Sequence, residues 1–339
     1  MARLRLLSLA LGIFFLAQPG AAARTRVSDG RPAMGTVLEI TLEGTDPARL
    51  RSQLDQLFAL VSRLEATLTT WDEASPMQAL NRAAGGPARP VPQQLLALLR
   101  LAKASSRATD GVFDVTVGPL LALWRDAAAR GRLPGEEEIA ATRARVGAAG
   151  IVLEGDRVRL ADGVVVDLGG IAKGFALDRL AERLDAVEAG PALLDFGGSS
   201  WWARGAPEGA PGWRILVAQG PGTRTVVALR DEALSVSESL GQGFTIGDRR
   251  LGHVIDPRSG WPVEHAGRAA VRAPTASWAE IWSTALLVWP PQEALRRARA
   301  EPDVEALIVD EAGVRHETAG FGARRLVAPA RGASPVPRP

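Results

Sequence analysis

The sequence predicts an α+β fold, in which helices pack against mixed sheets within one large domain of two joined halves. Segments typical of strands and of helices follow one another without the strict alternation of a doubly wound fold. No stretch rich in Gly, Ser or Pro separates two independent units, and no short repeat is present. The roughly 300 residues that follow the N-terminal segment are enough to bury a core of this size.

The first expected strand is Thr36–Gly44, where apolar and polar residues alternate. Pro90–Thr109 is a second helical segment, which starts after a pair of prolines, and Ala149–Asp167 contains two or three short strands separated by Gly-Asp turns. Between the first strand and these segments, apolar residues recur at three- and four-residue spacing. They predict one face of a long helix, formed by Leu50, Leu54, Leu57, Val61, Leu64 and Leu68.

The second half begins with a helix after Gly174, which carries a further apolar stripe. That stripe consists of Leu177, Leu180, Leu184 and Val187. Pro191–Gly205 and Gly212–Gly220 contain further strands, and Ala306–Gly320 is typical of a hairpin.

Residues 1–23 are predicted to be a cleavable secretory signal. A short basic segment precedes the apolar run Leu6–Ala17, and small residues follow it. This run is too short to cross a bilayer, which takes about 20 residues; an uncleaved anchor is the alternative. The chain has no cysteine, which excludes disulfides and a lipid attached to an N-terminal cysteine. We therefore expect a protein that is periplasmic or otherwise exported and soluble after cleavage, with its domain at 24–327 and a disordered tail at 328–339.

The charge balance argues against a nucleic-acid partner. The chain has 40 Lys and Arg against 38 Asp and Glu, a formal net charge of +2. Removal of Arg3 and Arg5 with the signal brings that charge to about zero. A protein without excess positive charge has no electrostatic reason to bind nucleic acid or an anionic membrane. No second apolar run reaches membrane length, so we expect no stable membrane insertion.

A glycine-rich turn within Val164–Leu184 is the first candidate binding element. A strand ends at Asp167, and Gly169, Gly170 and Lys173 then lead into a helix. Free N–H groups at a helix start bind phosphate, and glycines let the backbone approach a ligand closely. The turn matches neither of the two commonest nucleotide-binding motifs. An ordinary strand-to-helix connection with a surface lysine explains these residues equally well.

Other stretches share this density of small and polar residues. Each has an ordinary structural explanation when taken alone, because Asp-Pro often starts a turn and a single histidine is more often structural than catalytic. These stretches are Arg31–Thr36, Asp110–Trp124, Leu193–Ser200 and Gly252–Val263.

Taken together and in this order, the stretches resemble the FAD:protein FMN transferases, the ApbE-like flavin transferases. The resemblance spans roughly Ala33 to Phe321, and two of its motifs, D-L-G-G-I-A-K-G and H-x-I-D-P-R-[ST]-G, are distinctive. The matching residues are Met34–Thr36, Gly111–Leu120, Asp167–Gly174, Gly197-Gly198, Ser237, His253–Gly260 and Glu280–Thr284. The resemblance implies the ApbE-like flavin transferase fold.

The resemblance also implies an activity. Such an enzyme binds FAD and Mg²⁺, transfers FMN to a Thr or Ser hydroxyl of an acceptor protein and releases AMP. The expected acceptor is an exported or membrane-bound electron-transfer subunit. Attack at phosphorus depends mainly on charge neutralisation and alignment, for which Mg²⁺ held by a carboxylate is a common device. Two alternatives stay open: hydrolysis of FAD to FMN and AMP, and FAD binding without turnover.

Roles for individual residues follow from the same resemblance. It implies catalytic roles for Ser237, His253 and Asp256. The implied metal ligands are Glu280, Thr284 and the carbonyl of Ala172, and the i, i+4 spacing puts the first two on one helix face. The implied FAD-binding residues are Met34, Trp71, Asp114, Thr116, Asp167, Gly169, Gly170, Lys173, Gly197, Gly198, Ser237, His253 and Arg258.

The chain departs from the family pattern at several places. Glu280 stands where the family has aspartate, and Ser277 three residues earlier makes a capping-box pattern, so Glu280 could instead be bonded to the start of its own helix. The family's S-G-D turn is Ser237–Ser239 here, and Val115 replaces a proline. The chain has no tyrosine, and Trp71 stands where the family often has one; it is either a flavin-packing residue or a core tryptophan.

Overall fold

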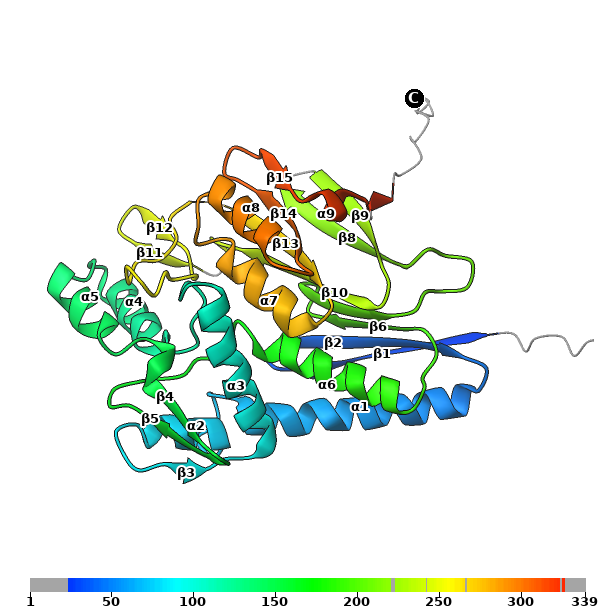
Figure 1. The fold of residues 1–339 in the computed structure, drawn as a ribbon, viewed down its shortest axis with the longest axis horizontal. Coiled ribbons are helices and arrows are strands. Elements are labelled where there is room, and N and C mark those ends of the chain that lie inside the picture. The colour runs from blue at the N-terminus through cyan, green and yellow to red at the C-terminus, as the bar shows by residue number, and fades with distance from the viewer. Residues whose placement is uncertain (1–23, 221–222, 242, 266, 324, 327–339) are drawn as a thin grey trace, which may run out of the picture.

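An eight-stranded antiparallel sheet forms the centre of the molecule (Figure 1). The computed structural model describes residues 24–220, 223–241, 243–265, 267–323 and 325–326. The predicted signal at 1–23 and tail at 328–339 lie outside these residues. In spatial order, the strands are β1 (Thr25–Ala33), β2 (Thr36–Gly44), β6 (Ala192–Phe196), β7 (Ser200–Arg204), β10 (Glu232–Glu238), β13 (Arg268–Ala273), β14 (Glu305–Val309) and β15 (Arg315–Glu317).

Among the described residues, four helices cover one face of this sheet: α1 (Pro47–Leu68), α6 (Ala172–Ala186), α7 (Ala276–Ala285) and α8 (Pro291–Ala300). Every residue of the apolar stripe predicted for the long helix is buried in α1, so that prediction is confirmed. Asp46 caps this helix by accepting bonds from the amides of Ala48 and Arg49 at 2.9 and 3.1 Å. The main hydrophobic core lies between these helices and the sheet.

A small sheet packs on the opposite face. It contains β16 (Arg325–Leu326), β9 (Thr223–Leu229) and β8 (Trp213–Gly220). Successive side chains of a strand point to opposite faces, and along β10 this places Ala233 in the core beneath the helices and Leu234 in the second core. The large sheet is therefore buried on both faces around β10.

Several smaller elements complete the fold. Around Trp124, a third core joins α4 (Gly118–Arg130) and α5 (Glu136–Arg143) to the hairpin of β11 (Phe244–Ile246) and β12 (Arg249–Leu251). The other elements are α2 (Pro76–Arg82), β3 (Arg89–Pro90), α3 (Gln93–Ala108), the 3-10 turn η1 (Ala148–Gly150), β4 (Ile151–Glu154), β5 (Arg157–Leu160) and α9 (Ala319–Ala323).

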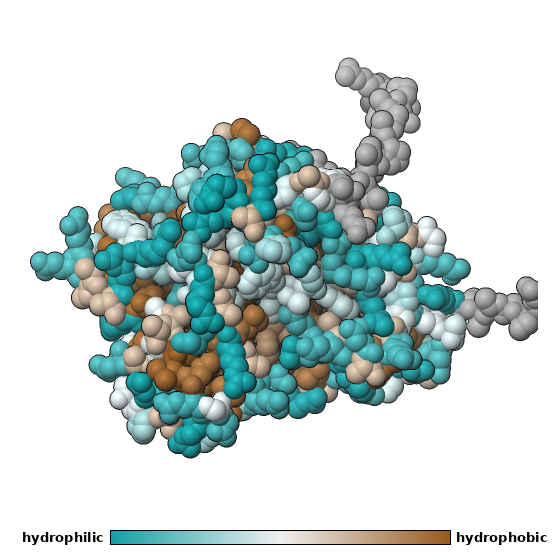
Figure 2. All heavy atoms as spheres, viewed as in Figure 1, coloured by the Kyte–Doolittle hydropathy of each residue, from teal (hydrophilic) through white to brown (hydrophobic). Residues whose placement is uncertain are grey.

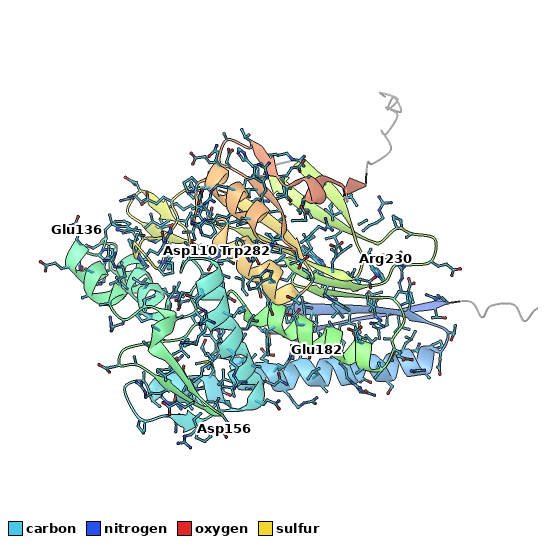
Figure 3. The ribbon with its side chains drawn as sticks, in the orientation of Figure 1. Asp110, Glu136, Asp156, Glu182, Arg230 and Trp282 are labelled. Atoms are coloured by element: carbon cyan, nitrogen blue, oxygen red, sulfur yellow. The ribbon has the colours of Figure 1, made fainter. Side chains whose placement is uncertain are left out.

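The figures show how side chains are distributed on this framework. On the face drawn in Figure 2, hydrophilic side chains predominate, and a group of apolar ones shows at the lower left, over the region of α3 and β4. Figure 3 places Trp282 on α7 near the middle of the molecule, whereas Glu136, Asp156 and Arg230 lie toward its periphery. Among the described residues, no helix combines the length and apolarity needed to cross a bilayer.

The α+β prediction is confirmed, and most predicted elements are present. Two of the strands expected within Ala149–Asp167 form, as β4 and β5. The end of that segment makes only an isolated parallel bridge, between Val165 and Val117. Val187 lies just after α6 and is half-buried, whereas the rest of its predicted stripe is buried.

Candidate functional site

A cleft of about 530 Å³ opens where α6, α7, β7 and β10 meet the segment that leads into α4. Apolar side chains line it from two segments, Val112–Leu121 and Phe244–Ile255. Most of the predicted site residues also line it: Asp114, Asp167, Gly169, Gly170, Lys173, Ser237, His253, Glu280 and Thr284. The other predicted residues do not: Met34, Trp71, Thr116, Ala172, Gly197, Gly198, Asp256 and Arg258.

Lys173 projects into the cleft from the first turn of α6. Its Nζ donates to Ser199 Oγ at 2.9 Å and lies 3.8 Å from Oε1 of Glu280. About a quarter of the side chain is exposed. No role was predicted for Ser199; its only signal in the sequence is a position directly after Gly197 and Gly198, in the turn that joins β6 to β7. The lysine is thus part of a polar group built from α6, α7 and this turn.

Glu280 is buried and bonded to a different helix from its own. Its Oε2 accepts a hydrogen bond from the amide of Gly174 at 2.6 Å. Burial raises the pKa of Glu280, although Lys173 and the amide of Gly174 act in the opposite direction. The helix that carries Glu280 is capped by Thr275, which accepts from the amide of Trp278. The capping-box alternative for Glu280 is therefore wrong.

A row of hydroxyl groups lies beside Glu280, between β10 and α7. Ser237 Oγ is 2.8 Å from Ser283 Oγ and 3.4 Å from Thr284 Oγ1. Ser283 Oγ also lies 3.1 Å from Ser235 Oγ and 3.0 Å from the carbonyl oxygen of Glu280. Small serine side chains let the helix approach the strand closely, and they leave this wall of the cleft polar but uncharged.

Asp114 organises the loop that forms another wall. Its Oδ2 accepts bonds from Ser106 Oγ at 3.0 Å and from the amide of Ala148 at 2.8 Å. Its Oδ1 accepts from the amide and the hydroxyl of Thr116, and that hydroxyl in turn accepts from the amide of Gly147. Both carboxylate oxygens are therefore used within the protein, and Thr116 holds the loop from behind the cleft.

The glycine-rich turn is compact for two local reasons. Asp167 Oδ1 accepts a hydrogen bond from the amide of Gly169 at 2.9 Å, which closes the turn. A Cβ atom on Gly170 would lie only 3.1 Å from the ring of Phe113. Gly170 therefore lets the turn and this aromatic ring meet at the cleft, and Phe113 is a lining residue to which sequence analysis gave no role.

His253 and the turn that follows it have different surroundings. The His253 side chain is exposed to the cleft, yet the surrounding protein reduces its hydration and lowers its pKa, with Glu238 acting in the opposite direction. Asp256 lies outside the cleft, where its carboxylate accepts from Arg258 Nε and Nη2, each at 2.9 Å. The carbonyl of Arg258 accepts from Arg143 at 2.7 Å, so this pair holds a turn against α5.

Two predicted FAD-binding residues lie in loops away from the cleft lining. Met34 has a φ of 46° in the turn that joins β1 to β2, and its amide donates to Glu65 Oε1 at 2.8 Å. Trp71 lies between α1 and α2 and is 89% exposed, so its interpretation as a core tryptophan is wrong.

The polar group beside α7 has the donor chemistry of a Mg²⁺ site that a substrate completes. Among the described residues, no group of three or more His, Cys, Asp or Glu side chains is arranged to hold a metal. Glu280 supplies one carboxylate, and Ser237 and Thr284 supply neutral oxygens next to it. Mg²⁺ is typically held by one or two carboxylates together with phosphate oxygens and water. These residues therefore fit Mg²⁺ only in the presence of a phosphate-bearing ligand.

Proteins of known structure share this fold. The flavinyl transferase ApbE of Pseudomonas stutzeri, solved in its apo form, superposes with a TM-score of 0.79 at 28% identity, covering 89% of this chain and 97% of that one. The ApbE protein of Thermotoga maritima also gives 0.79, at 25% identity, covering 89% and 100%. The fold is therefore that of the flavin transferases.

Sequence comparison identifies the family. The model of the ApbE family matches residues 34–308, so this chain belongs to the ApbE family. A relative in Klebsiella pneumoniae (strain 342) is 29% identical over 303 residues, which cover 86% of each chain. One in Escherichia coli (strain K12) is 27% identical over 317 residues, covering 88% of this chain and 90% of the relative. Both relatives are named FAD:protein FMN transferase.

Proposed function

We propose that this protein transfers FMN from FAD to a Ser or Thr hydroxyl of an acceptor protein and releases AMP. Membership of the ApbE family and relatives named FAD:protein FMN transferase support this activity. The observation that carries it is the meeting of Lys173 and Glu280 at the start of α6, inside the cleft. A lysine and a helix N-terminus at one place suit a diphosphate group, and the carboxylate beside them suits the Mg²⁺ that accompanies it.

In this reaction the acceptor oxygen bonds to the phosphorus of the FMN half, and the bond from that phosphorus to the bridging oxygen breaks. The bridging oxygen leaves with AMP, and the acceptor hydroxyl gives up its proton. Such transfers depend on alignment and on stabilising the charge that develops on phosphate oxygens. Lys173 supplies positive charge, and Gly169 and Gly170 let the diphosphate approach the backbone. Phe113 offers an apolar surface beside this turn.

Glu280 and Thr284 would hold Mg²⁺, with Ser237 next to them. The ion, when bound, neutralises charge on the diphosphate. The family implies the carbonyl of Ala172 as a further ligand; Ala172 is the first residue of α6, directly before Lys173, and this role stays a prediction.

His253 is our candidate for accepting the acceptor's proton. Its pKa is lowered, so the imidazole is neutral and able to take up a proton near pH 7. The catalytic role predicted for Asp256 and the FAD-binding role predicted for Arg258 stay predictions, and we assign neither residue a step, because their side chains pair with each other outside the cleft.

The acceptor we expect is an exported or membrane-bound electron-transfer subunit. This expectation rests on the family resemblance, and the predicted signal at 1–23, which would place the enzyme in the periplasm or otherwise outside the cytoplasm as a soluble protein, agrees with it. Hydrolysis of FAD needs only that water replace the acceptor hydroxyl at the same cleft, and it is therefore the competing reaction.

The decisive experiment incubates purified 24–339 with FAD, Mg²⁺ and an exported flavoprotein subunit encoded near this chain. We expect flavin fluorescence on the denatured acceptor and one AMP for each FMN attached, and we expect Lys173→Met to lose both. AMP and free FMN without labelled acceptor would support the hydrolase instead. Bound but unchanged FAD would leave the protein as a flavin carrier.

A further inference from the structure

Ser200 presents a buried hydroxyl group at the cleft that has no partner within the described protein. It is the first residue of β7, and its side chain is only 1% exposed. Its Oγ makes no hydrogen bond among the described residues, although the residue lines the cleft. Buried polar atoms are nearly always paired, so an unpaired one at a binding cleft points to a ligand.

The surroundings of Ser200 would accept an apolar residue. The nearest residue of its strand on the same face, Trp202, is apolar and buried in the main core. Across the sheet, Ser200 is paired in register with Ser235 of β10, which also lines the cleft. A hydroxyl at this position therefore contributes no hydrogen bond to the described fold, and it faces the same cleft as the hydroxyls of α7.

The chemistry next to Ser200 identifies the kind of ligand. The preceding residue, Ser199, accepts the hydrogen bond from Lys173 Nζ. A hydroxyl donor beside an ammonium group suits a negatively charged oxygen, because hydrogen bonds to ionised acceptors are the stronger ones. From this arrangement we infer that Ser200 donates its hydroxyl hydrogen to a phosphate oxygen of the bound dinucleotide. This inference rests on the proposed function, because it takes FAD as the ligand.

A hydroxyl that makes its hydrogen bond only to bound FAD can be recognised from two measurements, FAD affinity and the stability of the free protein. Removing the oxygen should weaken FAD binding, because a hydrogen bond to a charged phosphate is lost. It should not weaken the free protein, because no described partner loses a bond and a buried unpaired atom is removed. A structural serine behaves in the opposite way.

Ser200→Ala therefore has a matched control in Ser105→Ala. Ser105 is equally buried, but its Oγ donates to the carbonyl of Leu101 at 2.8 Å and it lies outside the cleft lining. For Ser200→Ala we expect the Kd for FAD to rise roughly 10- to 100-fold, with a Tm at or above that of the wild type. For Ser105→Ala we expect a lower Tm and an unchanged Kd. Ser200→Cys, which keeps the size but donates poorly, should follow Ser200→Ala.

Two probes separate a phosphate contact from a contact to the flavin ring. ADP carries the diphosphate without flavin, and riboflavin carries the ring without phosphate. We expect Ser200→Ala to weaken ADP as a competitor of FAD by about the same factor as FAD itself, and to leave riboflavin binding unchanged. An unchanged Kd for FAD in folded Ser200→Ala, or an equal loss for riboflavin, would overturn the inference. Failure of the wild type to bind FAD would instead count against the proposed function.

Discussion

Asp178 and Glu280 each accept hydrogen bonds from the first turn of the helix that carries the other. Asp178, on α6, accepts from the amides of Ala276 and Ser277 at 2.6 and 3.1 Å, at the start of α7. Glu280, on α7, accepts from the amide of Gly174 at 2.6 Å, at the start of α6. Helix starts leave amides without backbone partners, and α6 has no side-chain cap on its own N-cap residue. The exchange fastens the two helix starts to each other beside the cleft.

Replacing Asp178 should therefore cost more than removing an ordinary helix cap. Asp178→Ala leaves the buried amides of Ala276 and Ser277 without an acceptor, and we expect the free energy of unfolding to fall by roughly 2–3 kcal/mol. Asp46→Ala, which removes the exposed cap of α1, should cost about 1 kcal/mol. Urea denaturation measures both. A loss for Asp178→Ala no larger than that for Asp46→Ala would contradict the interhelical role.

Gly174 allows the same two helices to come together. A Cβ atom there would lie 2.6 Å from the carbonyl oxygen of Ala276 and 2.7 Å from the Cα of Ser277, and backbone atoms cannot rotate aside. In an exposed helix, Gly→Ala stabilises by about 1 kcal/mol. Here we expect Gly174→Ala to destabilise the protein, by roughly 1–3 kcal/mol in thermal or urea unfolding.

Gly241→Ala is the control for this destabilising effect of a Gly→Ala substitution. A Cβ atom at Gly241 has no atom of the described residues within 4 Å, so the substitution should leave stability nearly unchanged. A stabilised Gly174→Ala protein would show that α6 and α7 tolerate a wider separation than the structure indicates.

The helices were the most predictable part of the fold, because their signal is local. The stripe from Leu50 to Leu68 repeats at helical spacing, and all of it is buried in α1. β1 was not predicted, because its sequence is mostly polar and contains Gly30 and Pro32. It lies at the edge of the large sheet, where one side has no neighbouring strand within the part of the chain that the structure describes and such residues are tolerated. Its pairing with β2 makes it a strand, although its own residues do not favour one.

The sequence predicted which residues lie in the site, but not which hydrogen bonds they make there. Family motifs selected Lys173 and Glu280, and the structure places both in one cleft. The capping-box interpretation of Glu280 failed because it used residues close in sequence, whereas the true partner, Gly174, lies 106 positions away. Ser199 carried only the signal of its position after Gly197 and Gly198, and Ser200 carried none of its own, since serine is common in turns and only the folded neighbours show which hydroxyl lacks a partner.

His253 gives a prediction for pH dependence. Protonated imidazole cannot accept a proton, so kcat/KM for flavin transfer should fall as pH drops through the pKa of His253. That pKa is lowered, so the acid limb of the profile should lie below the usual histidine value of about 6.5. We expect His253→Gln to abolish this limb and to lower kcat about 100-fold or more.

His316→Gln is the matched control, because His316 pairs with Asp310 at 3.0 Å in the hairpin of β14 and β15, outside the cleft lining. It should keep both the rate and the pH profile of the wild type. If His253→Gln retains the acid limb, the group that titrates there is a different one.

The last prediction concerns the charged side chains of the cleft. Lys173 is bonded to Ser199, and Glu238 pairs with Arg268 at 3.0 Å. Arg125 of α4 also lines the cleft; it is exposed, and it makes no hydrogen bond or ion pair among the described residues. An unpaired guanidinium in a cleft that receives a diphosphate is available to attract it.

Arg125→Gln should therefore weaken substrate capture without slowing the chemistry. We expect the KM for FAD to rise about 5-fold at low salt, which corresponds to about 1 kcal/mol for an exposed contact, while kcat changes less than 2-fold. The difference from the wild type should shrink as ionic strength rises, because salt screens exposed charges. Arg130→Gln removes an equal charge from the same helix, but Arg130 lies outside the cleft lining and pairs with Asp126 at 2.6 Å, so its KM should match the wild type. Equal KM values for both variants would show that Arg125 does not contribute to FAD binding. A fall in kcat would show that it acts in the chemical step, next to the reacting atoms.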